Sequence, residues 1–376
     1  MRPRVLLVGR TRYRLPLDES LKRKFDALGA LMDVRVLGSA PPGGPAGDET
    51  FRLVRPARPR LLDGLLFHLG LPFRSARELR GFRPDAVVVQ GAHEATAVLL
   101  GRVLARSRAR VVLDVHGDWR TATRLYGSPA RRLLNPVADR LAALAVRRAD
   151  AVRTISDYTT GLVREAGAEP AAVFPAFMDL EPFLERPPEP LPKRPAALFV
   201  GVLELYKNVD GLVEAWRLAA PRIPEAELRI VGKGPRAGLV ADLVEELPEQ
   251  ASWRLSLTSE EVARALDEAT VLVLPSRSEG MGRVIVEALC RGRPVVASRV
   301  GGIRDLVRDG ENGILVEPGD PAALADALVG VLSDRALAER LAARARPNVE
   351  GWLATPEEYA ERMHALVAAL TLPADA

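Results

Sequence analysis

The chain has 376 residues, of which 27% are charged and 48% are hydrophobic, and its formal net charge is +4. This composition is typical of a folded globular protein, and it excludes a disordered or fibrous chain. The length favours two domains, no apolar stretch is long enough to span a bilayer, and the single cysteine, Cys290, excludes an internal disulfide and a cysteine-based metal cluster.

The first residues are predicted to form a strand rather than a signal peptide. Residues 1–14 read MRPRVLLVGRTRYR, in which arginines interrupt the apolar run and no small-residue cleavage site follows. We therefore expect a cytoplasmic protein, which also fits the single thiol.

Charge is distributed unevenly along the chain. Residues 1–190 hold 31 Lys and Arg against 21 Asp and Glu, whereas residues 191–376 hold 22 against 28. A basic front half suits nucleic acid, an anionic membrane surface or a phosphorylated small molecule, and charge alone does not choose among them.

Strand-like and helix-like patterns alternate along the chain, which is typical of α/β domains with parallel sheets. In the front half, buried strands are expected at Val5–Val8, Ala86–Val89 and Val111–Val115, and helices at Asp18–Leu28 and Ala95–Ala105.

A proline-rich segment separates this series from a second one. Residues 182–195 contain six prolines and are predicted to be an interdomain linker with neither helix nor central strand. The strands expected after it are Ala197–Val200, Leu228–Val231, Val271–Leu274, Pro294–Ala297 and Gly313–Val316.

Further signals predict helix starts in this second half. Thr258 with Glu261 forms a capping box, and Asp320 followed by Pro321 predicts an N-cap with proline in the first turn. The last stretch, Pro356–Leu370, has the pattern of an amphipathic helix.

The densest group of functional candidates follows the strand at Val271–Leu274. Gly280 and Gly282 stand where a helix is predicted to begin, so that the backbone N–H groups of Met281, Gly282 and Arg283 face an approaching anion.

Two glutamates flank this helix start. Glu279 and Glu287 are eight residues apart, more than two helical turns, and so cannot act as a close carboxylate pair. They suit two separate sets of ligand hydroxyls, although isolated glutamates are most often solvated surface residues.

These residues carry a family resemblance. Glu279, seven intervening residues and Glu287 resemble the nucleotide-sugar site of the retaining family 4 glycosyltransferases. The strand ending at Gly201, followed by Lys207, resembles that family's first phosphate loop. Residues 228–235 resemble the family's next strand and turn, and weaker resemblances lie at residues 114–119, 148–156 and 174–183.

The resemblance implies the GT-B architecture, in which two Rossmann-like α/β domains with parallel sheets face each other across a cleft. Residues 1–186 would form the acceptor domain and residues 187–350 the nucleotide-sugar donor domain. A C-terminal helix at about residues 351–376 would cross back onto the first domain.

It also implies roles for individual residues. Glu287 would bind the ribose hydroxyls, Glu279 a hydroxyl of the transferred sugar, and Lys207 the diphosphate, with Gly201 beside it. His116 would lie beside the reacting sugar and the acceptor, so the candidate catalytic residues are His116, Lys207 and Glu279. Lys207 has a clear physical task, because a fixed cation stabilises the charge that develops on the departing diphosphate.

The sequence departs from the family pattern in the donor half. Val202 stands where the family usually has an arginine, and Arg283 at the helix start is our candidate replacement, although an exposed helix arginine is an equally common arrangement. The usual Asn-Gly before the linker is replaced by Ala176 and Phe177.

The front half lacks the glycine pair of the family's N-terminal phosphate loop. Arg10, Arg12 and Arg14 stand there instead, on the loop predicted after the first strand. We expect at least one of them to contact an anionic acceptor, such as a lipid phosphate or a phosphosugar. The other interpretation is that these alternating arginines lie on one side of an extended, solvated loop and bind no ligand.

Two further sequence features concern membrane contact and metal dependence. Residues 60–80 mix apolar clusters with arginine as peripheral membrane segments do, but core helices look similar, so a membrane surface at the inner face stays open as a partner. No Asp-x-Asp and no paired histidines occur, which predicts a transfer without metal or any other cofactor.

Three other functions are compatible with parts of the sequence. GKGPRAG at residues 232–238 resembles a dinucleotide fingerprint, but residues 251–257 lack the acidic residue that a dehydrogenase would need. A nucleic-acid-binding front half is disfavoured by the 5% aromatic content. A nucleotide-sugar epimerase of the same architecture is the nearest competitor.

The sequence therefore predicts a retaining hexosyltransferase that moves a hexose or amino sugar from a UDP- or GDP-sugar to a hydroxyl acceptor, in cell-envelope or other glycoconjugate biosynthesis. Nucleic acid is not expected as a partner.

Overall fold

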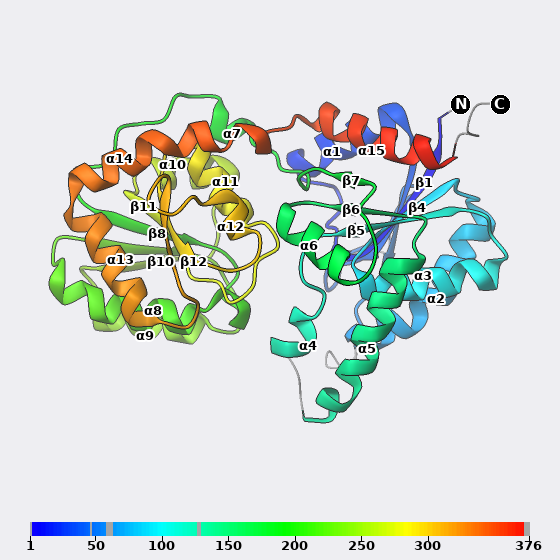
Figure 1. Cartoon of the computed structure of the whole chain (residues 1–376), viewed down its shortest axis with the longest axis horizontal. Helices are drawn as coiled ribbons and strands as arrows, with labels where there is room; N and C mark the ends of the chain where they lie inside the picture. The colour runs from blue at the N-terminus through cyan, green and yellow to red at the C-terminus, as the bar shows by residue number, and fades with distance from the viewer. Residues whose placement is uncertain (1, 46, 58–62, 126–128, 372–376) are drawn as a thin grey trace. The chain divides into compact units, whose positions relative to one another are not determined.

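The chain forms two compact units, each built on a parallel sheet (Figure 1). The computed structural model describes residues 2–45, 47–57, 63–125 and 129–371. Unit 1 comprises residues 1–179 and 354–376, and unit 2 comprises residues 180–353.

Unit 1 has a seven-stranded parallel sheet in the order β3-β2-β1-β4-β5-β6-β7. Its strands are β1 (Arg4–Arg12), β2 (Asp33–Ser39), β3 (Phe51–Val54), β4 (Ala86–Gln90), β5 (Arg110–Val115), β6 (Ala151–Thr154) and β7 (Ala172–Val173). Its helices are α1 (Glu19–Leu31), α2 (Asp63–Gly81), α3 (Ala92–Ala105), α4 (Thr121–Leu125), α5 (Pro129–Arg148), α6 (Asp157–Glu165) and α15 (Pro356–Thr371).

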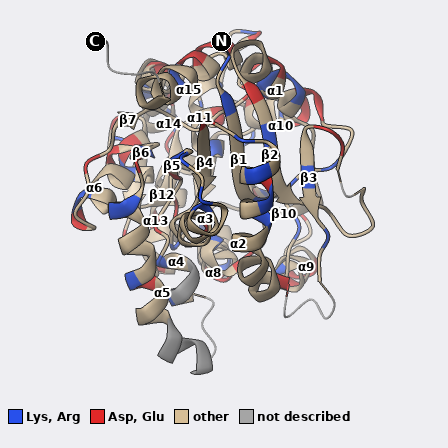
Figure 2. Cartoon of the chain, turned by 90° about the vertical axis from the view of Figure 1, so that its right-hand side faces the viewer, with Lys and Arg blue, Asp and Glu red and all other residues tan. Residues whose placement is uncertain are grey.

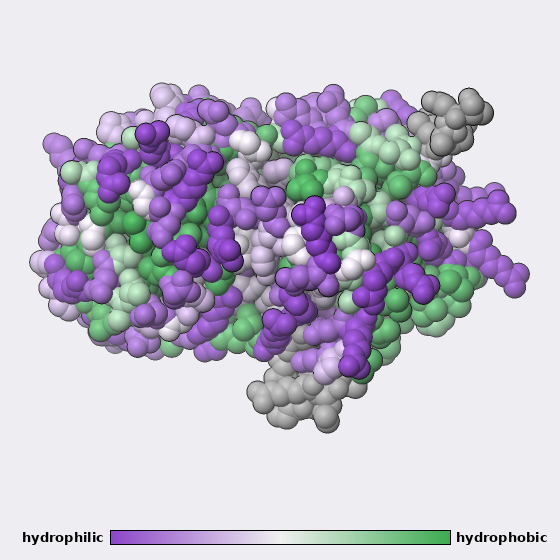
Figure 3. Space-filling model, in the orientation of Figure 1, coloured by the Kyte–Doolittle hydropathy of each residue, from purple (hydrophilic) through white to green (hydrophobic). Residues whose placement is uncertain are grey.

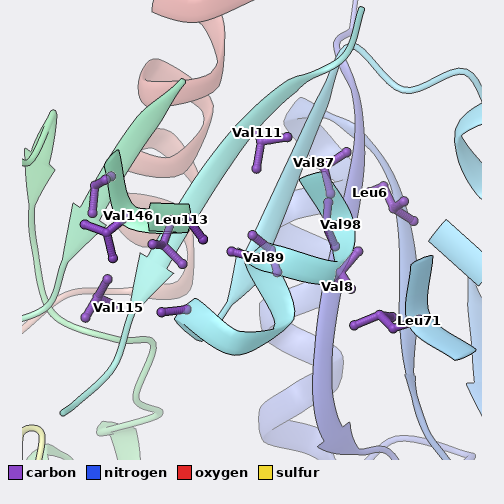
Figure 4. Close-up of a cluster of buried hydrophobic side chains, with 14 of the residues drawn as sticks. Leu6, Val8, Leu71, Val87, Val89, Val98, Val111, Leu113, Val115 and Val146 are labelled. Atoms are coloured by element: carbon purple, nitrogen blue, oxygen red, sulfur yellow. The ribbon is translucent and has the colours of Figure 1, made fainter. Parts of the chain in front are cut away.

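The strands in the middle of the unit 1 sheet contain short apolar runs, such as Val5–Val8 and Ala86–Val89, because both faces of the sheet are buried there. Successive side chains point to opposite faces, so Leu6 and Val8 pack with α2, α3 and α5, whereas Val5 packs with α1 and α15. Figure 4 shows the first of these clusters, with Leu71 of α2 and Val98 of α3 beside the strand side chains.

Unit 2 has a six-stranded parallel sheet in the order β10-β9-β8-β11-β12-β13. Its strands are β8 (Ala196–Val200), β9 (Glu227–Val231), β10 (Ala251–Arg254), β11 (Val271–Leu274), β12 (Val295–Ser298) and β13 (Gly313–Val316). Its α-helices are α7 (Glu181–Leu184), α8 (Val209–Ala219), α9 (Ala237–Glu246), α10 (Ser259–Asp267), α11 (Arg283–Cys290), α12 (Ile303–Leu306), α13 (Pro321–Ser333) and α14 (Arg335–Ala345).

The strands and helix caps predicted from the sequence are confirmed. All eight expected strands are present, with ends that differ by four residues at most. Thr258 and Glu261 form the predicted capping box, and the Asp320 side chain accepts from the N–H of Ala323. No helix in the described part of the chain is long and apolar enough to cross a membrane.

The prediction of a helix-free linker at residues 182–195 is wrong in part. Pro182 lies in the first turn of α7, where a missing N–H costs nothing. The segment also packs within unit 2, because two buried arginines donate to its carbonyl groups. Arg291 donates to the carbonyls of Arg186 and Pro187, at 2.7 and 3.1 Å, and Arg293 donates to that of Glu189 at 2.7 Å.

Candidate functional site

The strand order of unit 2 places a topological switch point between β8 and β11. Chains leaving these neighbouring strands diverge, and ligands of such sheets bind at the carboxyl ends of the strands at this point. The loop after β8 contains Lys207, and the loop after β11 contains Glu279. The two loops are joined by a hydrogen bond from the N–H of Arg277 to the carbonyl of Tyr206, at 2.7 Å.

Lys207 and Glu279 form an ion pair at this switch point. The distance from Lys207 Nζ to Glu279 Oε2 is 2.5 Å, and the two side chains are only 11% and 15% exposed. The Ser276 hydroxyl donates to the same carboxylate oxygen at 3.3 Å. A fixed cation and a fixed carboxylate are therefore held side by side, where one can meet phosphate oxygens and the other a hydroxyl.

Arg277 fixes the loop that carries Lys207, a role that the sequence did not reveal. Its guanidinium donates to the carbonyl of Leu205 at 2.8 Å and to both carboxylate oxygens of Asp210, at 3.1 and 2.6 Å. A bidentate arginine of this kind holds its partners in a defined orientation. The only sequence signal was an acidic residue three positions after Lys207.

The helix predicted near Gly282 is α11, which begins at Arg283. Gly282 precedes it with φ of +82°, and Met281 before it is buried. Glu287 lies on the second turn, and Arg283 Nε donates to Glu287 Oε1 at 2.8 Å. Burial raises the pKa of the Glu287 carboxyl, and the neighbouring Arg283 opposes that shift. Arg283 is therefore held beside Glu287 on the surface of the helix.

The loop before α11 is pressed against the turn that precedes α12. The N–H of Gly302 donates to the carbonyl of Glu279 at 3.0 Å. A Cβ atom on Gly302 would lie 2.0 Å from the carbonyl oxygen of Gly280, so only glycine fits there. This contact fixes the backbone on which Glu279 and Gly280 are placed.

The glycine-rich segment at residues 232–238 has a packing role. Cβ atoms on Gly232 and Gly234 would lie 1.9 and 2.4 Å from the carbonyl oxygens of Gly201 and Leu203. The N–H of Leu203 also donates to the carbonyl of Lys233 at 3.0 Å. The glycines thus let the loop after β9 rest on the loop after β8, next to Gly201.

The switch point of unit 1 lies between β1 and β4. There the Thr11 hydroxyl donates to Gln90 Oε1 at 3.1 Å, and Arg10 pairs with Asp63 of α2 at 3.0 Å. The prediction that Arg10 and Arg12 lie on a loop is wrong, because β1 continues to Arg12, which pairs with β2 after a register shift. Both residues and Arg14 beyond the strand are exposed.

His116 follows β5 and is held by a buried carboxylate. Its Nε2 lies 2.8 Å from Asp114 Oδ2, and Asp114 Oδ1 accepts from Arg153 at 2.5 Å. Arg153 and Asp114 are 0% and 1% exposed, whereas the His116 side chain is 38% exposed. Burial by itself would raise the pKa of the Asp114 carboxyl, but Arg153 and His116 outweigh it and hold the pKa well below its usual range.

Arg153 also holds the segment that leads into Ala176 and Phe177. Its second Nη donates to the carbonyls of Phe174 and Pro175, at 2.8 and 2.5 Å. Phe177 then packs against Tyr359 of α15, with ring centroids 5.6 Å apart. In this chain the segment after β7 is therefore committed to the core of unit 1.

His68 of α2 has a charged partner in the structure. Its Nε2 lies 3.3 Å from Glu94 Oε1 at the start of α3, and its Nδ1 lies 2.7 Å from the carbonyl of Gly64. The hydrogen bond to Glu94 raises the pKa of His68. His68 and Glu94 are far apart in sequence, so no local pattern pairs them.

The predicted residues therefore form separate groups. Lys207 meets Glu279, Arg283 meets Glu287, and Gly201 and residues 280–282 line the same loops of unit 2. His116, Arg10, Arg12 and Arg14 belong to unit 1. Within the described residues, no group of three His, Cys, Asp or Glu side chains is arranged to hold a metal ion.

Comparison with known proteins gives matches along most of the chain. Residues 183–348 match the family described as "Glycosyl transferases group 1". Residues 19–176 match the domain described as "Glycosyl transferase 4-like domain".

Two curated relatives illustrate the sequence similarity. The chain is 30% identical over 230 residues to an alpha-D-kanosaminyltransferase of Streptomyces kanamyceticus, an alignment that covers 57% of this chain and 60% of the relative. It is 39% identical over 160 residues to a D-inositol 3-phosphate glycosyltransferase of Xylanimonas cellulosilytica, covering 40% of this chain and 37% of the relative. The matched part thus spans less than two thirds of either relative.

A solved structure shows the same fold. Alr3699/HepE of Anabaena, crystallised in complex with UDP-glucose, superposes with a TM-score of 0.70 over 96% of this chain and 99% of its own, at 16% identity.

Proposed function

The chain belongs to the group 1 glycosyltransferases, and from that premise we propose that it transfers a sugar from a nucleoside diphosphate sugar to a hydroxyl acceptor. The observation that carries the proposal is the Lys207–Glu279 ion pair at the switch point of unit 2. Matches to glycosyltransferase domains on both sides of residue 180 replace the dehydrogenase and nucleic-acid interpretations.

In this proposal unit 2 is the donor domain. Lys207 contacts the diphosphate, and the N–H groups at the start of α11 add partial positive charge beside it. Glu287 accepts hydrogen bonds from the ribose hydroxyls, and Glu279 accepts one from a hydroxyl of the sugar. The ion pair with Lys207 keeps the Glu279 carboxylate in place. Arg283 replaces the arginine that the family has at the position of Val202.

The proposed reaction requires these groups to stabilise the negative charge that develops on the diphosphate. As the glycosidic bond breaks, the departing diphosphate gains negative charge, which Lys207 stabilises without reorganising. We propose that no metal is needed, with retention of the anomeric configuration. EDTA should leave turnover unchanged, and a loss that Mg²⁺ or Mn²⁺ restores contradicts this part of the proposal.

Unit 1 is the proposed acceptor domain. His116 lies beside the acceptor hydroxyl, and Arg10, Arg12 and Arg14 favour an acceptor that carries a negative charge. The name of the inositol 3-phosphate relative is in keeping with a phosphorylated acceptor. Arg12→Gln is expected to raise the KM for an anionic acceptor and leave the donor KM unchanged, and equal changes in both contradict the assignment.

A thermal-shift screen of UDP- and GDP-sugars tests the function directly. A ligand at 100 times its Kd stabilises the folded protein by about 2.7 kcal/mol. Lys207→Met should abolish the shift, whereas Lys193→Met, at an exposed lysine of the same unit, should retain it. Release of free nucleotide then identifies transfer, while a changed nucleotide sugar without release identifies an epimerase.

A further inference from the structure

Unit 1 has an unusual concentration of exposed apolar side chains on three of its helices. Among the described residues, fourteen large apolar side chains are exposed, and ten of these lie on α2, α3 and α5. We call this set the apolar face: Leu65, Leu66, Leu69, Phe73, Leu100, Val103, Leu104, Val137, Leu141 and Leu144. Each is between 40% and 70% exposed.

The helical spacing gathers these side chains on one surface. Leu65, Leu69 and Phe73 follow each other at four-residue intervals on α2, on the stripe opposite Phe67 and Leu71, which pack into the core. The helix α3 packs against both α2 and α5. Green atoms accordingly gather over these helices in Figure 3. A contiguous apolar surface of this kind marks an interaction site.

A basic hollow adjoins the apolar face at the carboxyl ends of α2 and α3. It measures about 730 Å³ and is lined by five arginines, which we call the arginine hollow: Arg80, Arg83, Arg106, Arg108 and Arg110. Arg80 donates to the carbonyl of Leu104, an apolar-face residue, at 2.5 Å, so the two features touch.

The charge in this hollow is largely uncompensated. Arg110 pairs with Asp150 at 3.2 Å, but Arg83, Arg106 and Arg108 have no side-chain partner within the described residues. Asp85 is the one acidic residue in its lining. Basic residues of unit 1 are blue in Figure 2. The hollow is thus prepared for anionic groups.

We propose that the apolar face and the arginine hollow dock unit 1 on the surface of an anionic lipid bilayer. Leucine, valine and phenylalanine side chains enter the boundary between headgroups and acyl chains, and the arginines bind lipid phosphates. The positive charge of the arginine hollow makes a second copy of the chain an unfavourable partner for this surface, because a self-complementary contact would bring the arginines of both copies together. The proposal stands independently of the sugar-transfer reaction.

Vesicle flotation tests the proposal with the full-length protein. It should float with phosphatidylcholine vesicles that contain phosphatidylglycerol, float poorly with phosphatidylcholine alone, and be released by salt. Arg83→Gln, Arg106→Gln and Arg108→Gln together should weaken binding to the anionic vesicles on the order of 100-fold. Equal binding of the wild type to both vesicles overturns the role of the arginine hollow.

The apolar face is tested with a matched pair of variants. Leu69→Asp with Phe73→Asp should weaken vesicle binding by about 10-fold or more, because two inserting side chains become charged. Leu218→Asp with Leu255→Asp changes exposed leucines of unit 2 and should bind as the wild type does. Normal melting temperatures of all variants establish that they are folded.

Three outcomes overturn the docking proposal. The first is a wild-type protein that binds neither kind of vesicle, and the second is an apolar-face variant that binds as tightly as the wild type. The third is a dimer, detected by light scattering, that Leu69→Asp with Phe73→Asp dissociates, since the apolar face would then be covered by a second copy.

Discussion

The buried pair of Asp114 and Arg153 should respond strongly to the loss of one charge. In Asp114→Asn the Arg153 guanidinium, which is 0% exposed, loses its only carboxylate within hydrogen-bonding distance in the described structure. Breaking a buried ion pair in this way costs about 3–5 kcal/mol. Removing both charges in Asp114→Asn with Arg153→Met should cost less than the sum of the two single changes.

The same pair predicts a pH dependence. Because the pKa of Asp114 is lower in the folded chain than the usual ~3.9, its contribution is complete above that value and is lost as pH falls through the folded pKa. The difference in unfolding free energy between the wild type and Asp114→Asn should be constant near neutral pH and narrow in acid.

Hydrogen exchange of the β5 and β6 amides, measured as a function of urea concentration, gives the unfolding free energy of unit 1 separately from that of unit 2. It therefore measures the difference between the wild type and Asp114→Asn. Asp33→Asn is the control, because Asp33 pairs with Arg4 at 3.5 Å on the surface, where such pairs contribute about 0–1 kcal/mol. If Asp114→Asn costs no more than the control, the buried pair does not stabilise unit 1 as we argue.

Three further predictions concern Gly302, Cys290 and Arg277. Gly302→Ala places a Cβ 2.0 Å from a backbone oxygen, so it should lower the melting temperature and weaken donor binding, whereas Gly330→Ala, with nothing within 4 Å, should not; equal melting temperatures contradict the close approach. Because burial raises the pKa of the Cys290 thiol to about 12, a disulfide reagent at pH 8 should label it only in denaturant, and rapid labelling of the folded protein would show an open site. Arg277→Gln should raise the donor Kd by about 10-fold or more by freeing the Lys207 loop, while Arg217→Gln, which breaks a surface pair at 2.7 Å, should leave it unchanged; isothermal titration separates the two.

The parallel sheets were predictable because their strands are short, continuous apolar runs. Val271–Leu274 and Gly313–Val316 are found at the predicted ends, since strands buried on both faces need no polar alternation. β1 was predicted too short. It extends by four residues to Arg12, where exposed arginines follow a register shift and no apolar pattern marks the strand.

Long-range polar contacts could not be predicted in this way. Lys207 and Glu279 were both predicted as site residues, but their ion pair was not. It joins residues 72 positions apart and depends on two loops that meet at the switch point. Arg277 and Arg153 looked like ordinary arginines, because their partners lie 67 and 39 positions away. The prolines of residues 182–195 indicated a linker, and the two arginines that bind its carbonyls lie about a hundred positions further on.

Isothermal titration of the purified chain with UDP- and GDP-sugars tests the central claim most directly. We expect one of these compounds to bind the wild type and Lys193→Met equally. Lys207→Met and Glu287→Gln should each bind it at least about 100-fold more weakly, because each loses a charged hydrogen-bonding partner of the donor. Undiminished affinity in both of these variants, or no binding of any nucleotide sugar to the wild type, would contradict the assignment of unit 2 as the donor site.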